Sequence, residues 1–143
     1  MMPTTQALQK TKQIIVINEA RKPSTETVMA QMAQASAGAF VEAEQDAKET
    51  WLMTGRPWML LKALGEDDFR DFLAKAEQRK LPICRVMDVD ATASSTDGFT
   101  CLGIGPASVE QMDELAKVLD FYNWVRQNAF NASSLFPSNV TAI

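Results

Sequence analysis

Blocks of apolar and polar residues follow one another along this chain and predict strands and helices in turn. Residues 13–18 contain the β-branched run from Ile14 to Ile17, which favours a buried strand. Ser24 is suited to cap a helix that continues to about residue 48. Apolar residues recur in that helix at helical spacing, namely Val28, Met32, Ala35, Ala39 and Ala43. The pattern therefore opens with a buried strand followed by a long, alanine-rich helix.

The remaining pattern adds three strands and two helices. Strands are predicted over residues 58–63, 81–87 and 100–104, because short apolar runs there are bounded by Gly, Pro or charged residues. Helices are predicted over residues 66–79, which open with three acidic residues, and from Ser108 to about Tyr122. This order predicts one α/β domain with a mixed sheet of about four strands covered by helices.

Three segments differ in composition. Residues 13–122 hold the periodic pattern and are expected to form the domain, while the polar residues 1–12 are expected to be a flexible N-terminal segment. Residues 123–143 contain one charged residue but several large apolar ones. We expect this C-terminal extension to pack on the domain or on a partner subunit, because leaving it free would expose a large apolar surface.

Composition excludes several kinds of chemistry. The chain has 143 residues and no histidine, which excludes Ser-His-Asp catalysis and histidine-containing zinc sites. Two cysteines, Cys84 and Cys101, cannot form a four-cysteine zinc site and are expected to be buried, so we predict neither a metal nor a cofactor. A net charge of -4 argues against nucleic-acid binding through bulk charge. Without a long apolar run or a secretion signal, a cytoplasmic protein with no membrane segment is expected.

Residues 100–106, Thr-Cys-Leu-Gly-Ile-Gly-Pro, form the most distinctive stretch. Glycines within a strand indicate the close approach of another backbone or of a ligand. Both interpretations stay open, whereas a phosphate-binding loop is excluded because no Gly-Lys-Ser/Thr follows.

This stretch, with the helix that ends at Leu119-Asp-Phe-Tyr122, resembles the C-terminal part of class II peptidyl-tRNA hydrolases. Other similar motifs occur upstream in the same order: Gly55-Arg56-Pro57, Lys62-Ala63, Glu66-Asp67-Asp68, Lys80-Leu81-Pro82 and Asp88. The resemblance covers about residues 13–122. It implies the fold of that family, a homodimer, tRNA as a partner and hydrolysis of the ester that links a peptide to tRNA.

The resemblance also implies where the site lies. As catalytic residues it points to Asp88, Thr92 and Thr100, and as substrate-binding residues to Lys62, Asn18 and Gln34. Lys22 is a further catalytic candidate, because it lies shortly before the first helix and could reach into the site as a substitute cation. Asp88 would orient a water or hydroxyl, the threonines would hydrogen-bond the substrate, and Lys22 or Lys62 would stabilise negative charge. Two plainer explanations stay open, since Asp88 could instead cap the following loop and Lys62 could be a solvated strand end.

The chain departs from the family at its cationic positions. Asn18 stands where the family has an arginine, Gln34 where it has a histidine, and Thr25 and Thr27 where it has lysines, one of them considered essential for hydrolysis. Two functions follow. The first is hydrolysis of peptidyl-tRNA. The second is an inactive family member whose cleft binds a small ligand, such as a nucleotide, or a protein partner, and the two threonines favour this second function.

Overall fold

A computed structural model describes residues 10–87 and 98–130 of the chain. The elements follow the predicted order with one division of the first helix. They are β1 (Thr11–Asn18), the short 3-10 helix η2 (Glu19–Arg21), α1 (Thr25–Glu42), α2 (Gln45–Met53), β2 (Trp58–Ala63), α3 (Glu66–Gln78), β3 (Ile83–Met87), β4 (Phe99–Ser108) and α4 (Val109–Phe130). Thr11 and Lys12, which the sequence assigns to the N-terminal segment, therefore belong to the first strand.

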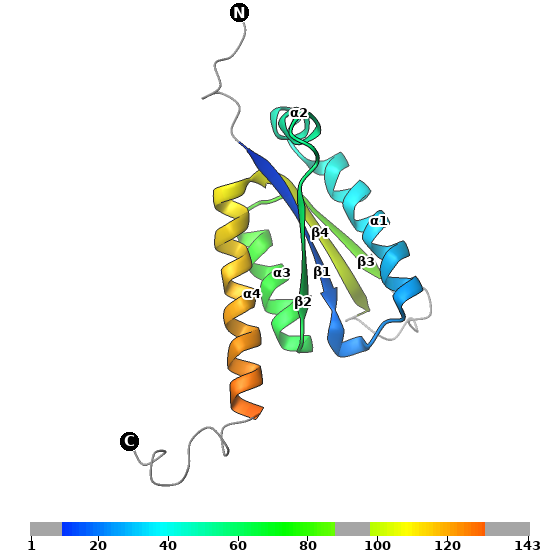
Figure 1. The fold of residues 1–143 in the computed structure, drawn as a ribbon, viewed down its shortest axis with the longest axis vertical. Coiled ribbons are helices and arrows are strands. Elements are labelled where there is room, and N and C mark those ends of the chain that lie inside the picture. The colour runs from blue at the N-terminus through cyan, green and yellow to red at the C-terminus, as the bar shows by residue number, and fades with distance from the viewer. Residues whose placement is uncertain (1–9, 88–97, 131–143) are drawn as a thin grey trace, which may run out of the picture.

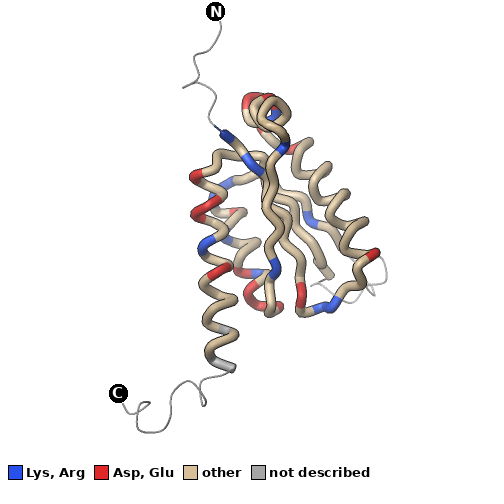
Figure 2. The backbone as a smooth tube through the Cα atoms, in the orientation of Figure 1, with Lys and Arg blue, Asp and Glu red and all other residues tan. Residues whose placement is uncertain are grey.

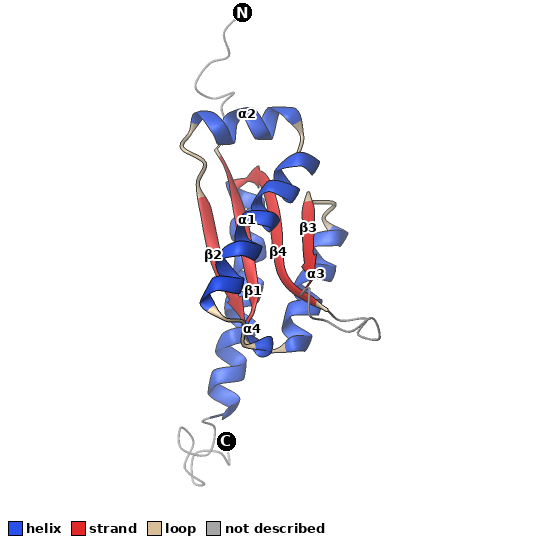
Figure 3. Ribbon diagram, turned by 90° about the vertical axis from the view of Figure 1, so that its right-hand side faces the viewer, coloured by secondary structure: helices blue, strands red, loops and turns tan. Residues whose placement is uncertain are grey.

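The four strands form one mixed sheet in the order β2-β1-β4-β3. β1 runs parallel to β2, with Ile17 in register with Lys62, and β4 runs antiparallel to both of its neighbours, β1 and β3 (Figure 3). The helical link between β1 and β2 permits the parallel pair, and the link between β3 and β4 permits the antiparallel one. The predicted fold class is confirmed.

Helices cover both faces of this sheet (Figure 1). α3 and α4 lie on one face, where Ile14 and Val16 of β1 join the larger core, and α1 lies on the other, against Ile15 and Ile17. β1 therefore alternates its side chains between two buried layers, which explains why its sequence is an uninterrupted apolar run. None of the helices in the described residues is long and apolar enough to cross a membrane.

The predicted long helix is in fact two helices. α1 ends at Glu42, because Ala43 and Glu44 adopt extended backbone angles, and α2 begins at Gln45. The change of direction lets Trp51 pack near Phe40 and donate a 2.7 Å hydrogen bond from its indole nitrogen to the carbonyl of Pro57. The helical pattern of the sequence continues through this corner, so composition alone does not mark it.

α4 extends eight residues beyond the predicted end at Tyr122, to Phe130. Asn123 joins the helix to the sheet, since its amide donates a 2.7 Å hydrogen bond to the carbonyl of Lys62 and its oxygen accepts one of 3.4 Å from the backbone of Leu64. The first part of the predicted C-terminal extension thus continues the last helix. Residues 131–143 lie outside the described part of the chain.

The glycines of β4 bring α1 close to the sheet. A Cβ placed on Gly103 would lie 2.1 Å from the carbonyl oxygen of Ala35, so helix backbone and strand backbone nearly touch there. Gly105 has a φ of +95° and faces the backbone of Lys12 in the neighbouring strand. The sequence left open whether a backbone or a ligand comes close to these glycines. At both positions the neighbour is backbone, which supports the first interpretation.

Candidate functional site

The predicted site residues that the structure describes gather mainly around the carboxyl ends of β1 and β2. β1 ends at Asn18, and the chain passes through η2 to Ser24, which caps α1. β2 ends at Ala63, close to where α3 starts, and β4 begins at the same end of the sheet because it is antiparallel to β1. In open α/β sheets, ligands bind outside the carboxyl ends of the parallel strands. This end is therefore the candidate site.

Thr100 is buried at this end and is paired with a glutamine of α1. Its hydroxyl donates a 2.8 Å hydrogen bond to Oε1 of Gln31, and it also lies 3.4 Å from the carbonyl oxygen of Val86. Both side chains are at most 5% exposed. Gln31 was not predicted as a site residue from the sequence, and its position on the buried face of α1 was the available signal. Thr100 thus fixes α1 to β4 rather than presenting a free hydroxyl.

Asn18 is also committed to the protein. Its fully buried amide nitrogen donates hydrogen bonds to Oε2 of Glu66, at 3.1 Å, and to the carbonyl of Phe99, at 3.3 Å. Its Oδ1 atom is buried and finds no hydrogen-bond partner within residues 10–87 and 98–130. The amide nitrogen expected to bind substrate instead joins β1 to the starts of α3 and β4.

Arg21 is a cation of the site that the sequence analysis missed. Its Nη2 donates a 2.9 Å hydrogen bond to Oε1 of Glu66, forming an ion pair, while its buried Nε has no partner among the residues that the structure describes. Only the fold shows that a residue of the β1–α1 connection meets the start of α3, 45 positions further along the chain. In the sequence, Glu66 stood out only within the acidic start of a helix that also forms part of the family resemblance, and nothing connected it with Arg21.

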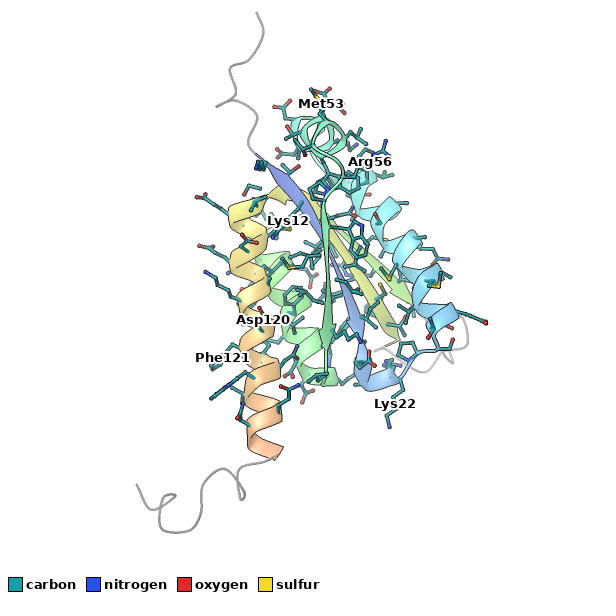
Figure 4. All side chains as sticks on the ribbon, in the orientation of Figure 1. Lys12, Lys22, Met53, Arg56, Asp120 and Phe121 are labelled. Carbon is teal, nitrogen blue, oxygen red and sulfur yellow. The ribbon has the colours of Figure 1, made fainter. Side chains whose placement is uncertain are left out.

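Lys22 and Lys62 bring two more cations to the same end of the sheet, because Lys22 follows β1 through η2 and Lys62 precedes the last residue of β2. Figure 2 shows basic and acidic segments close together at this end, and Figure 4 labels Lys22 there. Lys22 ends η2 in a left-handed conformation with φ of 48°, and its side chain is exposed. Lys62 lies in register with Ile17, one residue before the end of β1, and is exposed as well. Neither ammonium group forms an ion pair with any residue that the structure describes.

The first turn of α1 is polar and carries one charge, that of Glu26. Ser24 caps the helix by accepting a 3.2 Å hydrogen bond from the backbone N–H of Thr27, and its own hydroxyl donates to Oγ1 of Thr27 at 2.8 Å. Thr25 and Glu26 are exposed. The helix start therefore supplies backbone N–H groups to the site and no cationic side chain.

Not every predicted residue lies here. Gln34 is exposed, and its side chain makes no hydrogen bond to a described residue; its backbone carbonyl faces the Cys84 thiol at 3.7 Å. Asp88 and Thr92, which follow β3 along the chain, lie outside the described residues.

The other end of the sheet holds a hollow of about 1120 Å³. One side is acidic, with Glu42, Glu44 and Asp46, and another is basic, with Arg79 and Lys80. None of the predicted site residues lines it. This hollow is therefore separate from the candidate site.

The two thiols are not poised to act as nucleophiles. Burial raises the pKa of the Cys101 thiol to about 12, with a further contribution from nearby Cys84, and burial also raises the pKa of the Cys84 thiol. Both therefore stay protonated at neutral pH. Within residues 10–87 and 98–130, no cluster of three or more acidic, cysteine or histidine side chains could hold a metal ion.

Comparison with known proteins identifies the family to which this fold and this candidate site belong. Residues 11–122 match the model of the family "Peptidyl-tRNA hydrolase PTH2". The chain is 35% identical over 106 residues to a peptidyl-tRNA hydrolase of Methanopyrus kandleri, covering 73% of this chain and 91% of that protein. It is 29% identical over 114 residues to the mouse protein "Peptidyl-tRNA hydrolase 2, mitochondrial", covering 78% of this chain and 63% of the relative. The chain thus belongs to the PTH2 family of peptidyl-tRNA hydrolases.

Proposed function

We propose that this protein hydrolyses peptidyl-tRNA, separating the peptide from the 3′ end of the tRNA. The observation that carries the proposal is the gathering of Arg21, Lys22 and Lys62 at one end of the sheet, beside the start of α1. Hydrolysis of this ester requires that tRNA phosphates are held and that the oxyanion formed at the carbonyl is stabilised. Cationic side chains and helix N–H groups serve both needs.

In the proposed reaction, water adds to the carbonyl carbon of the ester and the bond from that carbon to the ribose oxygen breaks. The water provides the hydroxyl of the new peptide carboxyl group and the proton for the departing ribose oxygen. Lys22 and Lys62 stabilise negative charge, and Asp88 and Thr92 keep the roles that the family resemblance implies: orienting the water and hydrogen-bonding the substrate. Thr100 contributes indirectly by fixing α1 through Gln31.

The direct test measures release of an N-blocked amino acid from aminoacyl-tRNA by the purified protein, with the Methanopyrus kandleri relative as a positive control. We expect turnover well above the spontaneous rate, and a loss of activity in Lys22→Gln or Lys62→Gln. Lys117→Gln is the matched control, because Lys117 is exposed on α4. If the folded protein hydrolyses the substrate no faster than the spontaneous rate, while the relative is active in the same assay, the proposal is refuted.

One observation favours the second candidate, an inactive member that binds a ligand in the same place. The first turn of α1 carries Glu26 and no cation. A variant combining Thr25→Lys, Thr27→Lys and Glu26→Gly separates the two functions, because the Ser24 cap that supports this turn is retained. Gain of hydrolysis would show a site that lacks only its cations, whereas no gain in a folded variant would support a site remodelled for binding.

We further propose that the protein is a homodimer that pairs along β2. This strand is at the edge of the sheet, and Trp58, Leu60 and Lys62 share its exposed face. An antiparallel pair centred on Leu60 would bring the Leu60 side chains of the two subunits side by side and cover apolar surface that is exposed in the single chain. Light scattering should give twice the chain mass. Leu60→Lys should reduce it, whereas Phe121→Lys on α4 should not; equal masses for both variants would contradict this arrangement.

A further inference from the structure

One carboxylate at the start of α3 joins two residues of the β1–α1 connection. Oε2 of Glu66 accepts a 3.1 Å hydrogen bond from Asn18, and Oε1 accepts one of 2.9 Å from Nη2 of Arg21. Asn18 is fully buried at the end of β1, so it fixes the carboxylate relative to the sheet. Glu66 in turn fixes the guanidinium.

The position of Glu66 suits this role. It lies in the first turn of α3, where the helix dipole favours a negative charge, and its side chain is 31% exposed. A carboxylate has two oxygens with several lone pairs, so it can accept from both donors at once. A neutral amide in its place has a single acceptor oxygen. Its NH₂ group would face one of the two donors and could not accept a hydrogen bond from it.

The hydrogen bonding of Arg21 is incomplete. A guanidinium has five N–H donors in a planar fork. Among the described residues, Arg21 uses Nη2 for Glu66, and its Nε has no acceptor. Nε itself is buried, but 27% of the side-chain surface is exposed, so a ligand can approach the guanidinium from its exposed side. The free donors of a planar cation match the oxygens of a phosphate.

The surroundings also favour an anion, since Lys22 follows directly and α1 begins three residues later. The opposing charges that the structure describes at this end of the sheet include Glu19, Glu26 and Glu66, with Asp67 and Asp68 beside Glu66 in the first turn of α3. Net charge alone therefore does not attract an anion here. Binding therefore depends on how the donor groups are oriented, and Glu66 fixes the orientation of the Arg21 guanidinium.

We propose that Glu66 is a positioning residue that holds the Arg21 guanidinium against β1 and presents its remaining N–H groups to a phosphate of the ligand. This inference rests on the function proposed above, in which the phosphate belongs to the 3′-terminal nucleotides of tRNA. It predicts a change in affinity opposite to the change that net charge alone would cause. Removing the charge of Glu66 makes the protein more positive, yet it weakens binding of a polyanion because the guanidinium loses its fixed orientation.

The experiment measures binding of deacylated tRNA by fluorescence anisotropy over a range of salt concentrations. Arg21→Gln should weaken binding about 3- to 10-fold and lower the slope of log affinity against log salt by about 0.7, as expected for one lost contact to single-stranded phosphate. Glu66→Gln should also weaken binding. The matched controls are Lys117→Gln and Glu114→Gln, which change the same charges at exposed positions of α4 and should leave the slope unchanged.

Tighter tRNA binding by Glu66→Gln would overturn the proposal, because it would show that the carboxylate merely neutralises Arg21. Equal affinities and slopes for Arg21→Gln and Lys117→Gln, or no binding by the wild-type protein at low salt, would overturn it too. Melting curves test whether each variant is folded. If Glu66→Gln is unfolded, the difference in tRNA affinity and salt slope between Arg21→Gln and Lys117→Gln decides whether Arg21 contacts a phosphate. Deacylated tRNA lacks the carboxylic ester that joins a peptide to the 3′ end, so its binding is measured independently of hydrolysis. A protein that binds it through Arg21 but does not hydrolyse peptidyl-tRNA contradicts the proposed function alone.

Discussion

Gly103 is the point at which α1 lies closest to the sheet, and Gly103→Ala should force the two apart. The new Cβ would lie 2.1 Å from the carbonyl oxygen of Ala35 and 2.5 Å from its carbonyl carbon. Both are backbone atoms, which cannot rotate away as a side chain can. Since a Cβ atom is essentially never closer than 3.0 Å to such a neighbour, α1 must move by about 1 Å.

The expected cost follows from two contacts. Overpacking a close-packed interior costs about 1–3 kcal/mol, and a clash with backbone belongs at the upper end. The same movement stretches the 2.8 Å hydrogen bond from Thr100 to Gln31, whose net contribution is about 1 kcal/mol. We expect the free energy of unfolding to fall by about 3–4 kcal/mol, which lowers the melting temperature by roughly 10 °C in a chain of this size.

Urea unfolding followed by circular dichroism measures this loss, and Gly55→Ala is the control. Gly55 has a φ of +94°, and no atom of a described residue lies within 4 Å of the place that a Cβ would occupy there, so backbone strain alone, about 1 kcal/mol, should result. Combining Gly103→Ala with Ala35→Gly should not restore stability, because the clash is with a carbonyl. A loss for Gly103→Ala no larger than that for Gly55→Ala, or rescue by Ala35→Gly, would refute the reasoning.

Three further predictions concern other parts of the molecule. Thr100→Val leaves Oε1 of Gln31 without its buried donor and should lower the free energy of unfolding by about 1–3 kcal/mol in a denaturant titration; a loss near zero would contradict it. Because the net charge is -4, tRNA should bind no tighter than about 10⁻⁴–10⁻⁶ M at physiological salt, and a sub-micromolar affinity with a steep salt slope would contradict this. Hydrogen bonds from Tyr122 and then Lys75 lower the pKa of Asp71 below 3.8, so this carboxylate stabilises the fold at neutral pH and loses that effect as pH falls through the lowered pKa. The difference in melting temperature between the wild type and Asp71→Asn should accordingly disappear in acid, and a difference independent of pH would contradict the assignment.

The amino-acid sequence by itself determined the order of strands and helices, apart from the corner between α1 and α2, and indicated the family. The apolar run of β1 is readable because a strand buried on both faces needs apolar residues at every position, and the cap at Ser24 is readable because the hydrogen bond that it makes is local. The glycines of β4 could likewise be recognised as a place of close approach. Each of these features depends on residues that are near one another in the chain.

Tertiary structure alone decided how the candidate site is built. Asn18, Arg21 and Glu66 meet because the parallel pairing of β1 with β2 brings the start of α3 beside the end of β1. Gln31 meets Thr100 because the glycines let α1 approach β4. Neither contact leaves a trace in local sequence, since a glutamate at a helix start and a glutamine within a helix have ordinary local explanations. Periodicity reports which face of an element is buried, whereas the partner of a polar side chain depends on the register and packing of segments that are distant along the chain.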